Sequence, residues 1–142
     1  MEVNLTTYLI IYGATLAVFL GIDVVWLKLV VLDIFESRIG SIMRDQPLIG
    51  VAAGFYAAYV AGAIYFASAP VLGTPDLQPG DYAGVFVRGA MLGVLAYGTY
   101  EFTSMSIMKD WTWNMVILDT IWGGVLTGFS TVAGLWITRL ML

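Results

Sequence analysis

Three carboxylates, Asp23, Glu101 and Asp119, lie inside apolar runs of this sequence. Carboxylates can bind cations, hydrogen-bond to neighbours or act as general acids and bases. At the centre of a bilayer a charged Asp costs about 2.5–3.5 kcal/mol, and three neighbouring carboxylates also repel one another. We therefore expect one or more of them to be protonated, hydrogen-bonded to a Tyr or Thr, or bound to a cation.

Helical spacing predicts that the three carboxylates lie at one level. Counted from the nearest charged or aromatic residue at a helix end, each lies five to eight residues inside its run. At a rise of about 1.5 Å per residue, this is about 7–12 Å below the same membrane face. Tyr56 follows Pro47 by nine residues, which gives it a comparable level. Four helices thus each contribute a polar residue to one layer.

Aromatic and hydroxyl residues share helix faces with these acids. Asp23 and Trp26 are three residues apart, and so are Asp119 and Trp122, a spacing that makes neighbours on a helix. A ligand site is predicted at ten residues: Asp23, Trp26, Tyr56, Tyr59, Tyr97, Tyr100, Glu101, Ser104, Asp119 and Trp122. If a metal ion binds, its ligands are Asp23, Glu101 and Asp119, whose oxygens suit Mg²⁺ or Ca²⁺. In the alternative interpretation these acids only join helices, each contributing about 0.6 kcal/mol.

Two residue types are missing from the sequence, since it contains no Cys and no His. Disulfides, thiolate zinc sites and Cys nucleophiles are excluded, and the commonest general base and haem ligand is absent. The net charge of −4 argues against a nucleic-acid partner. We expect no cofactor.

Four long apolar runs must position the candidate residues. The chain is 60% hydrophobic and 11% charged, whereas soluble domains carry about 25% charged residues. The runs are continuous, whereas a β-barrel would show short alternating segments. The sequence predicts an all-α membrane protein with a single domain over residues 1–142. We expect a bundle of four transmembrane helices at approximately 5–30, 48–69, 82–106 and 113–137.

Three shorter segments complete this prediction. Residues 32–46 mix charged and apolar side chains, which favours a short amphipathic helix at the membrane interface. The alternative is a solvated linker, because Gly40 interrupts the pattern. Gly13, Ala17 and Gly21 form a stripe of small residues on which another helix can pack. Trp111 and Trp113 are expected to anchor the chain at the interface.

Basic residues near the helix ends predict the orientation. The segments after the first and third helices hold four of them, against one or two on the other side. By the positive-inside rule, both termini lie outside the cytoplasm, and we expect a bacterial inner membrane. The four residues are Lys28, Arg38, Arg44 and Lys109.

The motifs resemble the DUF2177 family of small uncharacterised bacterial membrane proteins. The matching blocks cover nearly the whole chain and are, in order, Asp23-x-x-Trp26, Phe55-Tyr56-x-x-Tyr59-x-x-Gly62, Tyr97-Gly98-Thr99-Tyr100-Glu101-Phe102-Thr103-Ser104 and Asp119-x-x-Trp122-Gly123. In that family the third block usually reads Thr-Tyr-Asp-Leu-Thr-Asn, so Glu101 and Ser104 depart from it. The resemblance implies a four-helix membrane protein of unknown activity, with a loose link to fatty-acid modification.

Three functions remain open, and the first is favoured. The polar layer binds or transports a small ligand, a lipid headgroup, a cation or protons. Alternatively, the chain is a lipid-modifying membrane enzyme or its accessory, with Glu101 or Asp119 as acid and base, which the lack of His and Cys disfavours. It could also be a structural subunit of a larger membrane complex. Expected partners are membrane lipids, a second copy of the chain or that complex.

Overall fold

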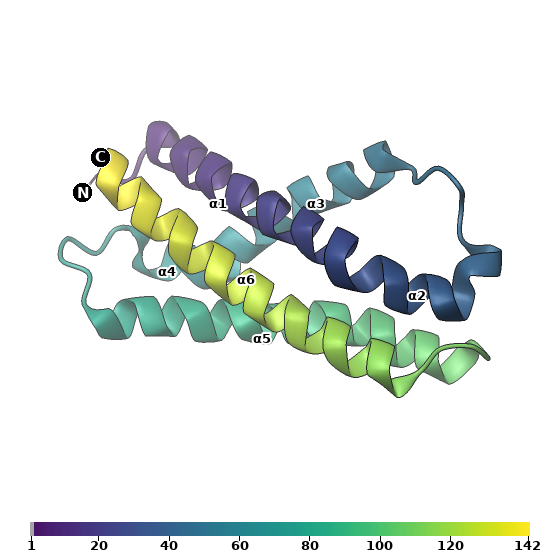
Figure 1. The fold of residues 1–142 in the computed structure, drawn as a ribbon. Helices are drawn as coiled ribbons and strands as arrows, with labels where there is room; N and C mark the ends of the chain where they lie inside the picture. Colours follow the sequence, from purple (N-terminus) through teal and green to yellow (C-terminus); the bar gives the residue numbers. More distant parts are fainter. Residues whose placement is uncertain (1) are drawn as a thin grey trace.

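Four helical segments run along the molecule, joined by three connections (Figure 1). The computed structural model describes residues 2–142, and within them there is no strand. In chain order the elements are α1 (Leu5–Trp26), the π-helix η1 (Leu27–Val31), α2 (Leu32–Ile39), the 3₁₀ turn η2 (Gly40–Ile42), α3 (Ile49–Ala63), the π-helix η3 (Ile64–Ser68), α4 (Ala69–Leu72), α5 (Pro79–Ile107) and α6 (Trp113–Met141).

Three of the four helical segments are long and apolar enough to cross a membrane. They are Leu5–Ile42, Ile49–Leu72 and Trp113–Met141. The remaining helix, α5, has 29 residues, enough to span a bilayer, but carries the polar run 97–104. The protein is therefore an all-α membrane protein built as a four-helix bundle. Both described ends of the chain lie at the same end of the bundle, as an even number of crossings requires (Figure 1).

Capping residues that are visible in the sequence set the N-terminal ends of α1 and α5. The side chain of Asn4 accepts a hydrogen bond from the backbone N–H of Thr7 at 3.1 Å. The hydroxyl of Thr7 in turn accepts one from the backbone N–H of Asn4, which completes a capping box. α5 begins at Pro79, three residues before the predicted start, because the Asp81 carboxylate accepts from the backbone N–H of Gln78 at 2.8 Å. Pro79 is suited to this first helical position because it needs no N–H donor there.

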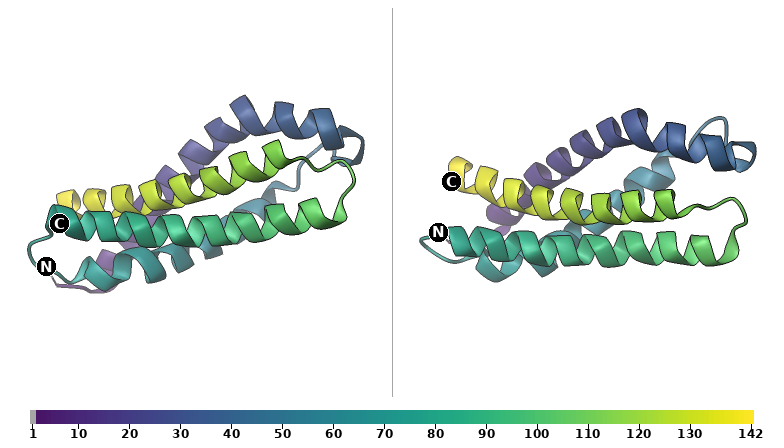
Figure 2. Two further views of the ribbon diagram at one scale, coloured as in Figure 1. Left: turned by 90° about the horizontal axis from the view of Figure 1, so that it is seen from below. Right: turned by 60° about the horizontal axis from the view of Figure 1, so that its bottom comes forward.

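The first helical segment is longer than the predicted helix over residues 5–30. It continues well past Lys28 to Ile42, 38 residues in all. Within it, η1 widens the helix by π-type hydrogen bonding, and the ribbon changes direction between α1 and α2 (Figure 2). The amphipathic segment is thus a helix continuous with the first, and a linker is the wrong description of residues 32–42.

The apolar face of α2 packs against the α5–α6 hairpin. Ile34, Phe35 and Ile39 contact a buried cluster at the end of that hairpin. The members of this cluster are Trp111, Met115 and Val116. Trp111 is only 5% exposed, so the prediction that it anchors the chain at the interface is wrong, whereas Trp113 is 56% exposed.

Glycines let α5 and α6 approach each other closely. A Cβ on Gly89 would lie 2.6 Å from the Thr131 hydroxyl, and one on Gly93 would collide with the carbonyl of Gly123. The stripe on α1 behaves differently, since Gly13 and Gly21 have no neighbouring atom within 4 Å of such a Cβ. Glycines therefore allow α5 and α6 to pack closely against each other, whereas no other helix of the described residues covers the stripe on α1.

The second helical segment packs unevenly along its length. Residues 48–55 are all exposed, whereas η3 is mostly buried and packs against α5 and α6. The start of α3 consequently diverges from α5, as the views in Figures 1 and 2 agree. We name the end of the bundle that holds the termini, η3 and α4 the packed half. We name the end that holds η1, α2, residues 49–59 of α3 and the hairpin connection the open half.

Candidate functional site

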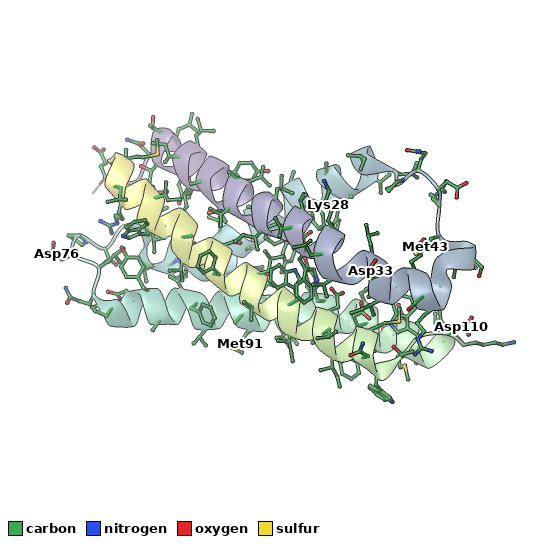
Figure 3. All side chains as sticks on the ribbon, viewed as in Figure 1. Lys28, Asp33, Met43, Asp76, Met91 and Asp110 are labelled. Carbon is green, nitrogen blue, oxygen red and sulfur yellow. The ribbon has the colours of Figure 1, made fainter. Side chains whose placement is uncertain are left out.

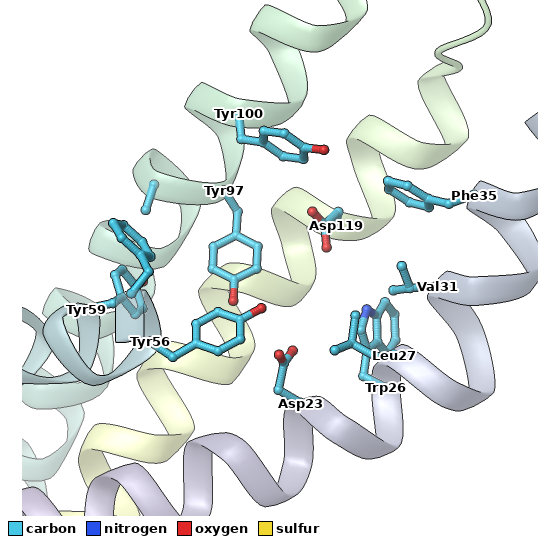
Figure 4. A pocket seen from close by; sticks show the side chains of 12 residues that line it. Asp23, Trp26, Leu27, Val31, Phe35, Tyr56, Tyr59, Tyr97, Tyr100 and Asp119 are labelled. Carbon is cyan, nitrogen blue, oxygen red and sulfur yellow. The ribbon is translucent and has the colours of Figure 1, made fainter. Parts of the chain in front are cut away.

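A cavity of about 550 Å³ lies in the open half between all four helical segments (Figure 4). Its lining combines two carboxylates with aromatic and aliphatic side chains. The lining residues are Asp23, Trp26, Leu27, Val31, Phe35, Phe55, Tyr56, Tyr59, Ala96, Tyr97, Tyr100 and Asp119. No lysine or arginine is among them in the part of the chain that the structure describes, residues 2–142.

Asp23 is the more enclosed of the two carboxylates and is only 3% exposed. Its Oδ1 accepts a hydrogen bond from the indole Nε1–H of Trp122 at 3.1 Å. The hydroxyl of Tyr56 points toward the same carboxylate from α3 (Figure 4). Side chains from two other helical segments, α3 and α6, therefore lie around this acid.

The two Asp-x-x-Trp motifs meet across the interface of α1 and α6. Trp26 and Trp122 stack with ring centroids 4.3 Å apart and an interplanar angle of 6°. The two helices run in opposite directions (Figure 1), and the acid of the first motif, Asp23, lies beside the Trp of the second, Trp122. The indole N–H of Trp26 is buried without a hydrogen-bond partner, although Asp119 lines the same cavity.

Tyrosines form the wall opposite the acids. Tyr56 and Tyr59 each pack against the buried ring of Phe19 with centroids 5.6 Å apart. The hydroxyl of Tyr59 hydrogen-bonds to the Thr127 hydroxyl at 2.8 Å and is thereby satisfied. The hydroxyl of Tyr97 has no partner although it is buried, and it points into the cavity (Figure 4). Two side chains with unpartnered donors, Trp26 and Tyr97, thus line the same cavity.

Glu101 lies outside the cavity, beside the hairpin connection. Its side chain is fully buried, and Oε2 accepts from the Trp111 indole N–H at 2.8 Å. Trp111 is held in turn by edge contacts with Phe35 and Tyr100, at centroid distances of 5.4 and 5.7 Å. Oε1 of Glu101 has no hydrogen-bond partner and faces its neighbour Asp119. Glu101 therefore belongs to the wall behind the cavity.

The structure brings most of the ten predicted residues together. Seven line the cavity: Asp23, Trp26, Tyr56, Tyr59, Tyr97, Tyr100 and Asp119. Trp122 reaches it through its contacts with Asp23 and Trp26. Glu101 and Ser104 do not line it, and the carbonyl of Ser104 accepts from Met108 at the end of α5.

The predicted depths of the carboxylates spread over about 5 Å, and the pairing of Asp23 is compatible with that spread. Asp23 pairs with Trp122, which lies three residues, or about 4.5 Å, further along α6 than Asp119. The depth of Asp23 was counted from Lys28, but the helix continues beyond that residue. Within residues 2–142 no group of three or more His, Cys, Asp or Glu side chains is placed to hold a metal ion.

Five lining residues were not predicted, and all are apolar: Leu27, Val31, Phe35, Phe55 and Ala96. Apolar residues are ordinary in a membrane helix, so composition gives no signal for them. Phe35 alone could have been proposed from the sequence, because it belongs to the apolar face of the amphipathic segment. Trp111 was also missed as a partner of Glu101, because the hairpin contact is visible only in three dimensions.

The arrangement suits binding better than acid–base catalysis at Glu101. Two carboxylates and two side chains with unpartnered donors, Trp26 and Tyr97, line one cavity with largely aromatic walls. Buried polar groups are normally hydrogen-bonded, and exceptions are frequent at sites that receive a ligand. The nearby π-helix η1 contributes Leu27 and Val31 to the lining, and such segments are also frequent at functional sites.

Comparison with known proteins gives one family. No curated protein and no solved structure matches the chain. The family model described as "Predicted membrane protein (DUF2177)" matches residues 8–136, which include most of all four helical segments and every lining residue of the cavity. The chain belongs to the DUF2177 family of predicted membrane proteins.

Proposed function

We propose that this protein binds a small, partly apolar molecule in the cavity of the open half, as a binding or transport protein. One observation carries the proposal: two carboxylates and two side chains with unpartnered donors, from different helices, line the same cavity of about 550 Å³. Ligand cavities typically have this size and this mixture of apolar walls with a few polar groups.

The mouth of the cavity supports access from the side of the bundle. Among the lining residues, Phe55, Ala96 and Tyr100 are exposed, and they lie on α3 and α5. These are the helices that diverge in the open half (Figure 1). A ligand dissolved in the lipid could therefore enter between them without crossing the packed half.

The test is a substitution that fills the cavity. Ala96→Trp adds a large side chain to the lining, and Ala83→Trp adds the same side chain to an exposed position near the other end of α5. Native mass spectrometry of protein extracted gently from its own membranes measures bound small molecules. We expect an adduct on the wild type and on Ala83→Trp that is absent from Ala96→Trp. Equal adducts on all three proteins would contradict the proposal.

The orientation is part of this proposal. Arg38, Arg44 and Lys109 lie in or beside the open half, whereas Arg139 lies at the end that holds the termini. Figure 3 likewise shows Asp110 at one end of the molecule and Asp76 at the other. The excess of basic residues supports an open half facing the cytoplasm of a bacterial cell. Cysteine labelling from outside the cell, at Asp76→Cys but not at Asp110→Cys, is the expected result.

A structural role is the second candidate, and the uncovered stripe on α1 favours it. Gly13, Ala17 and Gly21 are all exposed, and Gly13 and Gly21 have open space around them. Stripes of this kind pack helices together in membranes. Extraction in a mild detergent followed by mass measurement tests this role. A purely monomeric sample would contradict it.

A further inference from the structure

Within the described residues, the ionisable carboxyl groups that line the cavity are not balanced by basic residues. Asp23 and Asp119 contribute carboxyl groups, and no lysine or arginine of residues 2–142 lines the cavity to balance them. Lys28, the basic residue closest in sequence to Asp23, is exposed and is absent from the lining. An anion entering this space would meet like charge in an apolar setting, which is strongly unfavourable.

Most of the remaining lining residues are aromatic, and Leu27, Val31 and Ala96 complete the set. Seven rings surround the cavity: Trp26, Phe35, Phe55, Tyr56, Tyr59, Tyr97 and Tyr100. Faces of such rings attract a cation, with Trp the most effective, by about 0.5–2 kcal/mol each. Aromatic side chains also bury large apolar groups. A small inorganic ion would leave most of these surfaces without a contact.

A divalent metal ion fits this lining poorly. Ca²⁺ needs six to eight oxygen ligands and Mg²⁺ an octahedral set. Asp23 and Asp119 are held by different partners, and no group of three acids gathers within residues 2–142. An organic cation needs only charge compensation and apolar contact. Both are present here.

Building on the proposed function, we infer that the cavity takes a monovalent organic cation with apolar substituents, of the quaternary ammonium or phosphonium type. Its charge lies between the carboxyl groups of Asp23 and Asp119, and its substituents lie against Trp26 and the tyrosines of α3 and α5 (Figure 4). The side-facing mouth beside Phe55 suits such a molecule, because it partitions into lipid.

The test compares two probes of matched size and opposite charge. The full-length protein is placed in nanodiscs of zwitterionic phosphatidylcholine, and binding of tetraphenylphosphonium and tetraphenylborate is measured by equilibrium dialysis. Empty nanodiscs give the lipid background, which is subtracted. We expect saturable binding of tetraphenylphosphonium, at least tenfold tighter than any saturable binding of tetraphenylborate. No saturable binding of the cation, or equal binding of both probes, would overturn the inference.

Variants connect the binding to the two acids. Asp23→Asn and Asp119→Asn each should weaken tetraphenylphosphonium binding at least tenfold, because each removes one carboxylate from the lining. Asp33→Asn, on the exposed side of α2, is the matched control and should bind like the wild type. Asn keeps an oxygen acceptor for Trp122, and a thermal unfolding curve verifies that each variant folds. Unchanged affinity in both folded cavity variants would overturn the inference.

The inference and the proposed function can fail separately. If native adducts disappear in Ala96→Trp but the two probes bind equally, the cavity binds a ligand that is not selected by positive charge. If tetraphenylphosphonium binds Ala96→Trp as tightly as the wild type, the cation occupies another place, and the inference fails. If neither adducts nor probes respond to Ala96→Trp, both statements are wrong.

Discussion

The two halves of the bundle use the same four helical segments in opposite ways. In the packed half, α6 lies so close to α5 that a Cβ on Gly128 would be 3.0 Å from Phe86, and so close to α1 that one on Gly134 would overlap Thr15. In the open half, a Cβ on Gly54 would meet nothing within 4 Å, and α3 leaves a cavity in front of α5. Rigid packing at one end thus supports an enclosed space at the other.

Both halves contain buried polar atoms without a hydrogen-bond partner, among them Ser68 Oγ and Arg139 Nε in the packed half. In the packed half the guanidinium of Arg88 donates two hydrogen bonds, of 2.9 and 3.1 Å, to the carbonyl of Ala67 in η3. In the open half Trp26 and Tyr97 carry buried donors without partners. An unsatisfied buried donor costs about 1–3 kcal/mol. Such atoms occur in both halves, and what distinguishes Trp26 and Tyr97 is that their side chains line the cavity.

The largest loss of stability is expected where a new side chain would collide with the backbone inside the α5–α6 hairpin. Gly93→Ala should lower the free energy of unfolding by about 3 kcal/mol, because the new Cβ would overlap the carbonyl of Gly123. Gly54→Ala is the matched control in the open half and should raise stability by up to about 1 kcal/mol, since Ala favours a helix. Thermal unfolding in detergent measures both. Equal effects of the two substitutions would contradict the division into halves.

The next effect separates the two Trp–carboxylate pairs. Trp111→Phe and Trp122→Phe each remove an N–H donor, from Glu101 and Asp23 respectively, and each should cost about 2 kcal/mol of stability. Their effects on tetraphenylphosphonium binding should differ. Trp122→Phe should weaken it, because Asp23 lines the cavity, and Trp111→Phe should leave it within twofold of the wild type. The opposite order would show that Glu101 belongs to the binding site.

A smaller loss of stability is expected at the hydrogen bond that joins α1 to α3 where the two halves meet. The hydroxyl of Tyr12 donates a hydrogen bond of 2.8 Å to the carbonyl of Ala57, which ties α1 to α3 just below the divergent segment. Tyr12→Phe should cost about 1 kcal/mol. It should also increase hydrogen exchange in residues 49–57 while leaving α5 unchanged. Tyr8→Phe is the control, since its ring lies 47% exposed on the same helix.

The sequence predicted the helices well because apolar length alone defines a membrane crossing. It placed the end of the first helix too early, since Lys28 resembles a membrane boundary and nothing in one sequence reveals the π-helical continuation at Leu27–Val31. The start of α5 was placed too late for a related reason. Asp81 resembles an N-cap, whereas its carboxylate reaches back to Gln78 from the third helical position.

The candidate site was predictable where polar residues stand out in apolar helices. Asp23, Tyr97 and Asp119 line one cavity because polar side chains in a membrane protein face the interior of the bundle. The position of Glu101 was not predictable, because its partner Trp111 approaches through the turn of the hairpin. The packing of the glycine stripes was also not predictable. Four-residue spacing identifies a stripe of small residues, but it does not say whether another helix covers that stripe.

The most direct test of the central claim is a crystal structure of the protein purified from its own membranes in a lipidic phase. We expect electron density in the cavity between the carboxyl groups of Asp23 and Asp119, and none at that place in Ala96→Trp. A cavity closed by α3 packing against α5, or identical density in both proteins, would contradict the claim that the open half binds a ligand.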